Sequence, residues 1–140
     1  MNLLMKFSAL GTSLMLSVWA CANFDGDKSA RCDHAQPKTH VVKVTLDEDT
    51  SKPPSVDKPY VVACFEDEIV FQAKEDAEFS IKFKKGKSPF GKDLGSSKGK
   101  AKAKVKENPK RDAKFYKYDV VDTGVPKRPV LDPRIIITPR

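Results

Sequence analysis

Short runs of alternating apolar and polar residues recur along most of the chain. In residues 39–46, Val42, Val44 and Leu46 fall on one face at a period of two, which predicts a half-buried strand. The same alternation is found in three further runs, 79–83, 98–106 and 115–121. Apolar segments over 60–65, 69–73 and 134–138 also favour strands.

Turn-forming residues separate these runs and exclude a helix between them. Pro53, Pro54 and Pro59 break the linker after residue 46, and residues 85–97 are rich in glycine and serine. No segment shows a convincing helical period. The sequence predicts an all-β domain, an antiparallel β-sandwich of about seven strands.

The first 22 residues differ from the rest. Lys6 is the only charge before Asp25, and residues 7–20 are apolar or small, a run too short to span a bilayer, which needs about 20 residues. This predicts a signal peptide over 1–22, which signal peptidase cuts after the small-x-small sequence Ala20-Cys21-Ala22. The protein is therefore expected to be exported to the periplasm. Residues 18–21 also resemble the bacterial lipoprotein box, apart from Trp19; the alternative is a lipid anchor to the bacterial envelope at Cys21. A buried cytoplasmic helix is a third interpretation.

Residues 23–38 show no apolar period and are predicted to form a flexible N-terminal arm, followed by one domain over 39–140. Export changes the interpretation of the cysteines, because Cys32 and Cys64 are then the pair available within the domain. In an oxidising compartment we expect a Cys32–Cys64 disulfide. The alternative is that Cys64 is a small buried hydrophobe.

The order of the segments resembles a known fold. An apolar strand within FEDEIVF is followed by KEDAEFSIKF, the aromatic strand FYKYDV and a final RIII, which comes after Leu131-Asp132-Pro133. This order resembles small exported cupredoxin-like proteins with the plastocyanin-like fold, a Greek-key β-sandwich. The resemblance covers residues 39–138.

The resemblance implies a copper site that this sequence lacks. Blue-copper members hold the metal with two His, one Cys and usually a Met. Ala77 or Glu78 occupies the place of the first His, and residues 122–133 contain no Cys, His or Met. All three methionines lie within residues 1–15. We therefore expect no type-1 copper site and no cofactor.

Charge is distributed unevenly along the chain, whose formal net charge is +7. Residues 82–114 hold 13 basic and three acidic residues, whereas 47–78 hold ten acidic and three basic ones. Residues 98–106 alternate lysine with small residues, which suits contact with an anionic surface, protection of a sheet edge, or a disordered loop. Aromatic residues do not interleave with the lysines, so nucleic acid is not expected. The lysines concerned are Lys98, Lys100, Lys102, Lys104 and Lys106.

Other candidate chemistry is sparse. The acidic residues cluster at predicted turns without a nucleophile or base beside them, and no phosphate-binding loop is present, so an enzyme is not expected. Cys32, His34 and His40 are the one cluster of metal-ligand types. The sequence therefore favours a non-catalytic exported binding or structural module that engages an unknown protein or envelope component. Its alternatives are an envelope polyanion or anionic-lipid binder and a periplasmic copper or zinc carrier using those three residues.

Overall fold

The computed structural model describes residues 30–125 and 132–140. The predicted signal peptide, the lipidation candidate Cys21 and the first part of the predicted arm lie outside the described residues. Among the described residues, no helix has the length and apolar character needed to cross a membrane.

The described residues form nine strands and one short 3-10 helix, η1, in an all-β arrangement. The first five strands are β1 (Thr39–Thr45), β2 (Ser55–Val56), β3 (Tyr60–Cys64), β4 (Glu68–Gln72) and β5 (Phe79–Phe83). The remaining elements are η1 (Lys84–Gly86), β6 (Leu94–Gly95), β7 (Lys100–Lys104), β8 (Lys114–Asp122) and β9 (Arg134–Thr138).

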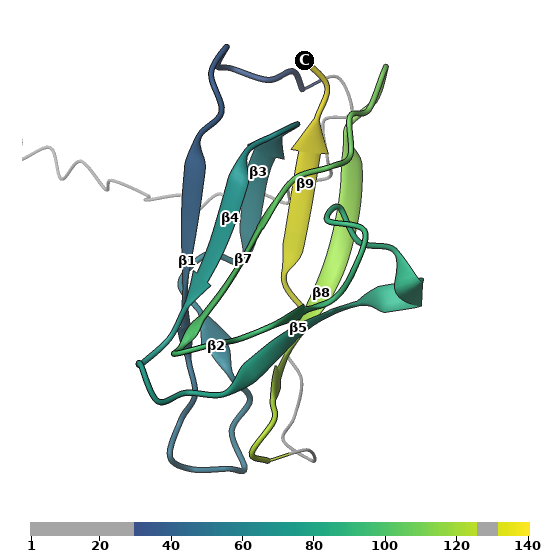
Figure 1. Ribbon diagram of the computed structural model, residues 1–140. Coiled ribbons are helices and arrows are strands. Elements are labelled where there is room, and N and C mark those ends of the chain that lie inside the picture. The colour runs from purple at the N-terminus through teal and green to yellow at the C-terminus, as the bar shows by residue number, and fades with distance from the viewer. Residues whose placement is uncertain (1–29, 126–131) are drawn as a thin grey trace, which may run out of the picture.

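The strands form two sheets that pack face to face (Figure 1). The four-stranded sheet has the order β2-β1-β4-β7, and the five-stranded sheet has the order β3-β9-β8-β5-β6. The chain changes sheet between β1 and β3 and again between β3 and β4, so sequence neighbours mostly lie in opposite layers. The predicted β-sandwich is confirmed.

Two strand pairs differ from the antiparallel prediction. β1 pairs parallel with β4, and β3 pairs parallel with β9, while the other pairs are antiparallel. Both parallel pairs join strands whose connection passes through the opposite sheet, so no tight hairpin forces them to run antiparallel. The count of nine exceeds the predicted seven because the two-residue strands β2 and β6 lie inside segments assigned to linkers.

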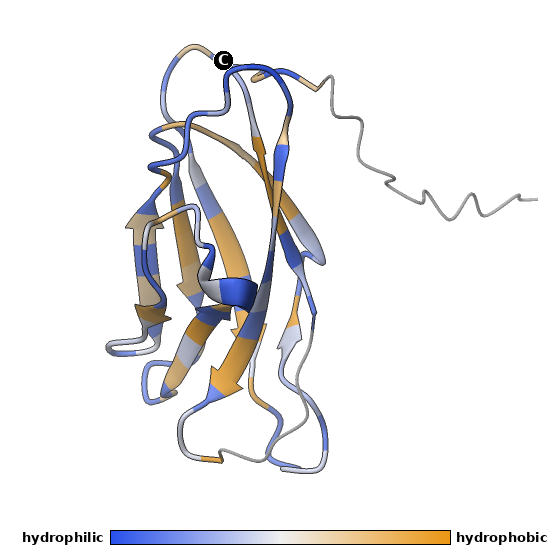
Figure 2. Ribbon diagram, turned by 90° about the vertical axis from the view of Figure 1, so that its right-hand side faces the viewer, coloured by the Kyte–Doolittle hydropathy of each residue, from blue (hydrophilic) through white to orange (hydrophobic). Residues whose placement is uncertain are grey.

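The alternation in the sequence matches the burial of the side chains. On β5, Phe79, Ile81 and Phe83 are buried, and Lys82 between them is exposed. On β8, Tyr116 and Tyr118 also face the core. Hydrophobic residues accordingly recur along the strands of both sheets (Figure 2). Aromatic rings bridge the layers, with Phe71 of β4 at 5.3 Å from Tyr118 between ring centroids.

The lysine-rich run is an ordered edge strand. β7 pairs antiparallel with β4 over Lys100–Lys104, so this part of the run is not a disordered loop. Gly99 fixes the turn before it, with a φ of 71° and a carbonyl that accepts a hydrogen bond from the Ala73 N–H at 2.8 Å. A Cβ at this position would lie 2.0 Å from the Lys74 carbonyl oxygen, so the close approach requires glycine.

Replacing Tyr118 with phenylalanine should stabilise the protein. Tyr118 has no exposed surface, and its hydroxyl has no hydrogen-bond partner among the described residues. A buried hydroxyl without a partner keeps its desolvation cost, so Tyr118→Phe should raise the free energy of unfolding by about 1 kcal/mol. Urea unfolding monitored by circular dichroism measures the change.

Tyr116→Phe is the matched control, because Tyr116 lies on the same strand face but at 9% exposure retains contact with solvent. It should change the free energy of unfolding by less than about 0.5 kcal/mol. A loss of stability in Tyr118→Phe would show that the hydroxyl has a favourable partner.

Candidate functional site

The carboxylate of Asp67 is fully enclosed at one end of the sandwich. Asp67 lies in the turn between β3 and β4, and its exposed fraction is 0%. Its own N–H donates to the Cys64 carbonyl at 3.1 Å, and its carboxylate accepts the Cys64 N–H at 3.0 Å and the Lys38 N–H at 2.9 Å. The side chain thus closes the turn and fastens the residue that precedes β1.

Both histidines of the chain contact this carboxylate. His34 Nε2 lies 2.9 and 3.0 Å from the two oxygens of Asp67, and His40 Nε2 lies 2.7 Å from Oδ2. On its other side, His34 Nδ1 lies 2.5 Å from the Asp33 carboxylate, which is exposed. The result is a compact carboxylate–imidazole cluster that joins the N-terminal segment, β1 and the β3–β4 turn.

These contacts shift the protonation of two groups. Burial would raise the pKa of Asp67, but hydrogen bonds from the Lys38 N–H, His34, His40 and the Cys64 N–H outweigh it and lower the pKa to about 2. The hydrogen bond to Asp67, assisted by the one to Asp33, raises the pKa of His34 above its usual range. The cluster therefore favours an ionised Asp67 and a protonated His34.

A disulfide lies directly against this cluster. Cys32 is bonded to Cys64 at the end of β3, with their Cα atoms 5.8 Å apart, as the sequence predicts. The Cys32 N–H donates to the Pro139 carbonyl at 2.7 Å, and the Arg140 guanidinium donates to the Ala35 and Phe65 carbonyls, both at 2.9 Å. The C-terminal tail therefore packs on the same end of the sandwich.

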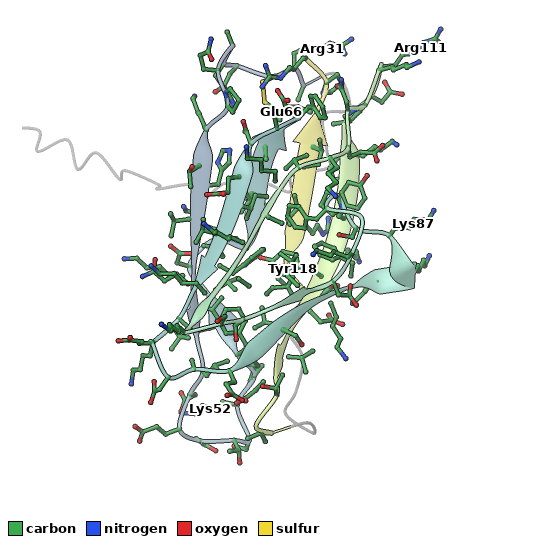
Figure 3. All side chains as sticks on the ribbon, in the orientation of Figure 1. Arg31, Lys52, Glu66, Lys87, Arg111 and Tyr118 are labelled. Atoms are coloured by element: carbon green, nitrogen blue, oxygen red, sulfur yellow. A yellow bond between two sulfur atoms is a disulfide. The ribbon has the colours of Figure 1, made fainter. Side chains whose placement is uncertain are left out.

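The segment predicted to be a flexible arm makes specific contacts where the structure describes it. Residues 30–38 contain no strand or helix, but the disulfide and the hydrogen bonds of Cys32, His34 and Lys38 hold them against the domain. Arg31 adds a hydrogen bond to the Arg111 carbonyl at 2.8 Å, at the same end of the molecule as Glu66 (Figure 3). The predicted domain boundary at residue 39 stays a prediction.

The structure groups two of the three metal candidates, Cys32 and His34, with Cys64 instead of with His40. The donor atoms of Cys32, His34 and Cys64 lie within 4.8 Å of one another. His40 is not part of this group, because its Nε2 contacts Asp67. In the disulfide form, the two sulfurs are bonded to each other and no thiolate is free to bind a metal.

Sequence reasoning missed Asp67. The sequence predicts only that the acidic residues cluster at turns. Glu66 is exposed at such a turn, whereas Asp67 is fully buried. The available signal was the shortness of the turn between two apolar strands. In so tight a turn, the middle acid comes close to the backbone N–H groups at the strand end, and its carboxylate can cap them.

The resemblance to cupredoxin-like proteins implies a type-1 copper site at the end of the sandwich opposite Asp67. Glu78 stands just before β5 and Asp122 ends β8, and the Thr123 N–H donates to the Glu78 carbonyl at 3.2 Å. Glu78, Asp122 and Gly124 help to line an open pocket of about 470 Å³. Its described lining contains no Cys, His or Met, in agreement with the sequence; residues 126–131 of the loop lie outside the described residues.

The lysines of the alternating run do not all belong to the strand. Lys100, Lys102 and Lys104 are exposed on one face of β7, with Ala101 buried behind them. Lys98 has a φ of 50° in the turn before the strand, and Lys106 follows it.

Comparisons with known proteins give no function for this chain. The chain matches no protein-family model and no curated protein. A reduced Cu(I) form of an amicyanin mutant matches 75% of this chain and 86% of its own, at 14% identity and a TM-score of 0.44. An oxidised amicyanin mutant matches 71% of this chain and 81% of its own, at 12% identity and a TM-score of 0.43.

At these values the likeness carries no argument about copper or activity. The strand order and the pairing within the two sheets form a β-sandwich, which agrees with the predicted all-β class.

Replacing Asp67 with asparagine should remove a pH-dependent part of the stability. The lowered pKa of Asp67 stabilises the fold above its ordinary value of 3.8, and this contribution is lost as the pH falls toward 2. The raised pKa of His34 contributes most below its ordinary value of 6.5 and is lost as the pH rises through the raised pKa. Asp67→Asn should therefore lower the free energy of unfolding near pH 5 by on the order of 2 kcal/mol.

Urea unfolding between pH 2 and pH 8 tests this expectation. The stability of the unmodified protein should fall between pH 4 and pH 2, and in Asp67→Asn this fall should be smaller. Glu66→Gln, an exposed neighbour in the same turn, is the control and should leave the profile unchanged. Parallel pH profiles for Asp67→Asn and the unmodified protein would contradict the assignment.

Proposed function

We propose that the protein is a non-catalytic, exported binding module that attaches to an anionic lipid surface through the outward face of its four-stranded sheet. We call this surface the lysine face and define it by Lys43 of β1 and by Lys100, Lys102 and Lys104 of β7. The observation that carries the proposal is the ordered placement of these lysines on one exposed sheet face.

The registers place the lysines in rows across the sheet. Gln72 of β4 pairs with both Lys43 and Lys100, so these two lysines lie on the same row. Lys102 and Lys104 follow at successive outward positions of β7, a spacing of about 7 Å along the strand. The result is an array of positive charge on a rigid backbone rather than on a loop.

The lysine face is poorly neutralised by its own protein. Among the described residues, Lys43, Lys100, Lys102 and Lys104 form no ion pair within 4.0 Å of an acid, whereas Lys84, Lys114 and Lys117 do. Glu68, paired in register with Lys104, is the one acid among the paired outward positions of β1, β4 and β7. An unpaired array of this kind attracts a polyanion, with a strength that salt reduces.

The middle of the face is apolar, which favours a lipid surface over a fully polar polyanion. Val41 of β1, at 37% exposure, pairs with Val70 of β4, which in turn pairs with Lys102. The methylene stems of the neighbouring lysines extend this apolar strip, while their ammonium groups reach the head groups.

Two observations support the other parts of the proposal. A Cys32–Cys64 disulfide persists in oxidising compartments, which agrees with the predicted signal peptide and export. His34 and His40 both contact the Asp67 carboxylate, so these groups serve to hold the fold together rather than to carry out acid–base chemistry.

Removing the positive charges of β7 should remove most of the binding to anionic vesicles. The triple variant Lys100→Gln, Lys102→Gln, Lys104→Gln should lose most of its co-sedimentation with vesicles that contain phosphatidylglycerol, because each basic residue near such a surface contributes about 1 kcal/mol. The unmodified protein should not sediment with neutral phosphatidylcholine vesicles, and raising the salt concentration should release it from anionic ones.

The matched control removes the same charge elsewhere, with Lys82→Gln, Lys85→Gln and Lys87→Gln. Lys82 is exposed on β5, Lys85 is exposed on η1, and Lys87 is exposed just after η1. Lys87 projects from the side of the molecule away from β1 (Figure 3). The control should still bind. An equal loss of vesicle binding in both variants would show that binding depends only on the net charge of the protein, and it would contradict the proposal. If the β7 variant instead aggregates while vesicle binding is unchanged, the lysines protect the sheet edge and the proposal fails.

A further inference from the structure

We propose that reduction of the Cys32–Cys64 disulfide creates a binding site for a thiophilic cation, Cu(I) or Zn(II), held by Cys32, Cys64 and His34. This site goes beyond the lysine face and is independent of it. It also differs from a type-1 copper site in place and in donors, because it lies at the other end of the sandwich and uses two thiolates and one imidazole.

The donor atoms are already gathered. The sulfurs of Cys32 and Cys64 and a nitrogen of His34 lie within 4.8 Å of one another, and His34 Nδ1 lies 3.9 Å from the Cys64 sulfur. A cation bound by two thiolates and an imidazole has donors about 2.0–2.3 Å from the metal, which places the donors themselves roughly 3–4 Å apart. Two soft sulfurs and one nitrogen favour copper(I) and zinc over magnesium or calcium.

Asp67 supplies the support that a metal-binding histidine needs. Its carboxylate holds His34 Nε2 at 2.9 Å, so the ring is oriented with Nδ1 facing the Cys64 sulfur. A carboxylate on the nitrogen opposite the metal is the usual arrangement for such a histidine, since it fixes the ring and its tautomer. Asp33, which contacts Nδ1 in the disulfide form, is 83% exposed and can turn away into solvent.

The surrounding backbone keeps the donors in place when the disulfide is absent. Residues 32 and 38 are held by the hydrogen bonds of the Cys32 N–H to Pro139 and of the Lys38 N–H to Asp67. Cys64 belongs to the β3–β9 ladder, where it is paired with Thr138. The sulfurs must move apart to share a cation, and the side chain of Cys32, in a segment without strand or helix, is the one able to move while its backbone N–H stays bonded to Pro139.

The chemistry balances with one co-reactant. A dithiol transfers two electrons and two protons to the Cys32–Cys64 disulfide and is itself oxidised to a disulfide, leaving two thiols on this protein. Binding of the cation then displaces both thiol protons and the Nδ1 proton of His34, so two sulfur–metal bonds and one nitrogen–metal bond form as two S–H bonds and one N–H bond break. In the reverse exchange, the two thiolates pass two electrons to the disulfide form of that co-reactant, which takes up two protons and becomes a dithiol again, and the cation is released as Cys32–Cys64 re-forms.

Metal titration of the full chain in both redox forms tests the proposal. The protein is reduced with a phosphine, separated from it without oxygen, and titrated with Cu(I) or Zn(II) against a colorimetric chelator. The reduced form should bind one equivalent and the disulfide form none. X-ray absorption of the loaded protein should show two sulfur neighbours and one nitrogen neighbour. Comparing the Cu(I) and Zn(II) arms identifies the preferred cation.

Variants separate this donor set from a site made of Cys32, His34 and His40. His34→Ala and Cys64→Ser should each weaken binding by at least about tenfold, whereas His40→Gln should keep the affinity of the unmodified protein. Circular dichroism of each reduced variant shows that it is folded. Three results would overturn the proposal: no binding by the folded reduced protein, equal binding by the disulfide form, or unchanged affinity in folded His34→Ala.

Discussion

The arrangement of one end of this sandwich depends on the buried carboxylate of Asp67. An ionised group without solvent is costly unless every part of it has a partner, and here two backbone N–H groups and two imidazoles provide those partners. They come from the segment before β1, from β1 itself and from the end of β3. Satisfying one carboxylate therefore fixes the N-terminal segment against both sheets and places the cysteines within bonding distance.

The two ends of the sandwich have different chemistry although they share one framework. The end formed by the start of β5 and the end of β8 presents Glu78 and Asp122 beside an open pocket. The cysteines and histidines lie at the other end, around Asp67. The outward face of β1, β4 and β7 carries the lysines between these ends. The framework of a β-sandwich therefore does not fix the position of a metal or partner site, which the side chains decide.

The sequence predicted those parts of the structure that a local period can encode. Alternation identified the buried faces of β5 and β8 and the exposed lysines of β7, because a period of two assigns side chains to faces directly. The parallel pairs β1–β4 and β3–β9 were missed, since no local pattern records which distant strand lies alongside. Asp67 was missed for a related reason. Its partners lie 27 and 33 residues away, and only the assembled fold brings them to it.

The joining of both ends of the described chain at one place has a mechanical consequence. Through the disulfide, a pull on the N-terminal segment is applied at Cys64, whose register partner on β9 is Thr138. A pull on the C-terminal tail is applied at that same Thr138. The two forces therefore open the parallel β3–β9 ladder from one end, one hydrogen bond at a time, instead of shearing all its bonds together. Once the disulfide is reduced, the same pull passes instead through residue 38 into β1 and is carried by the other sheet.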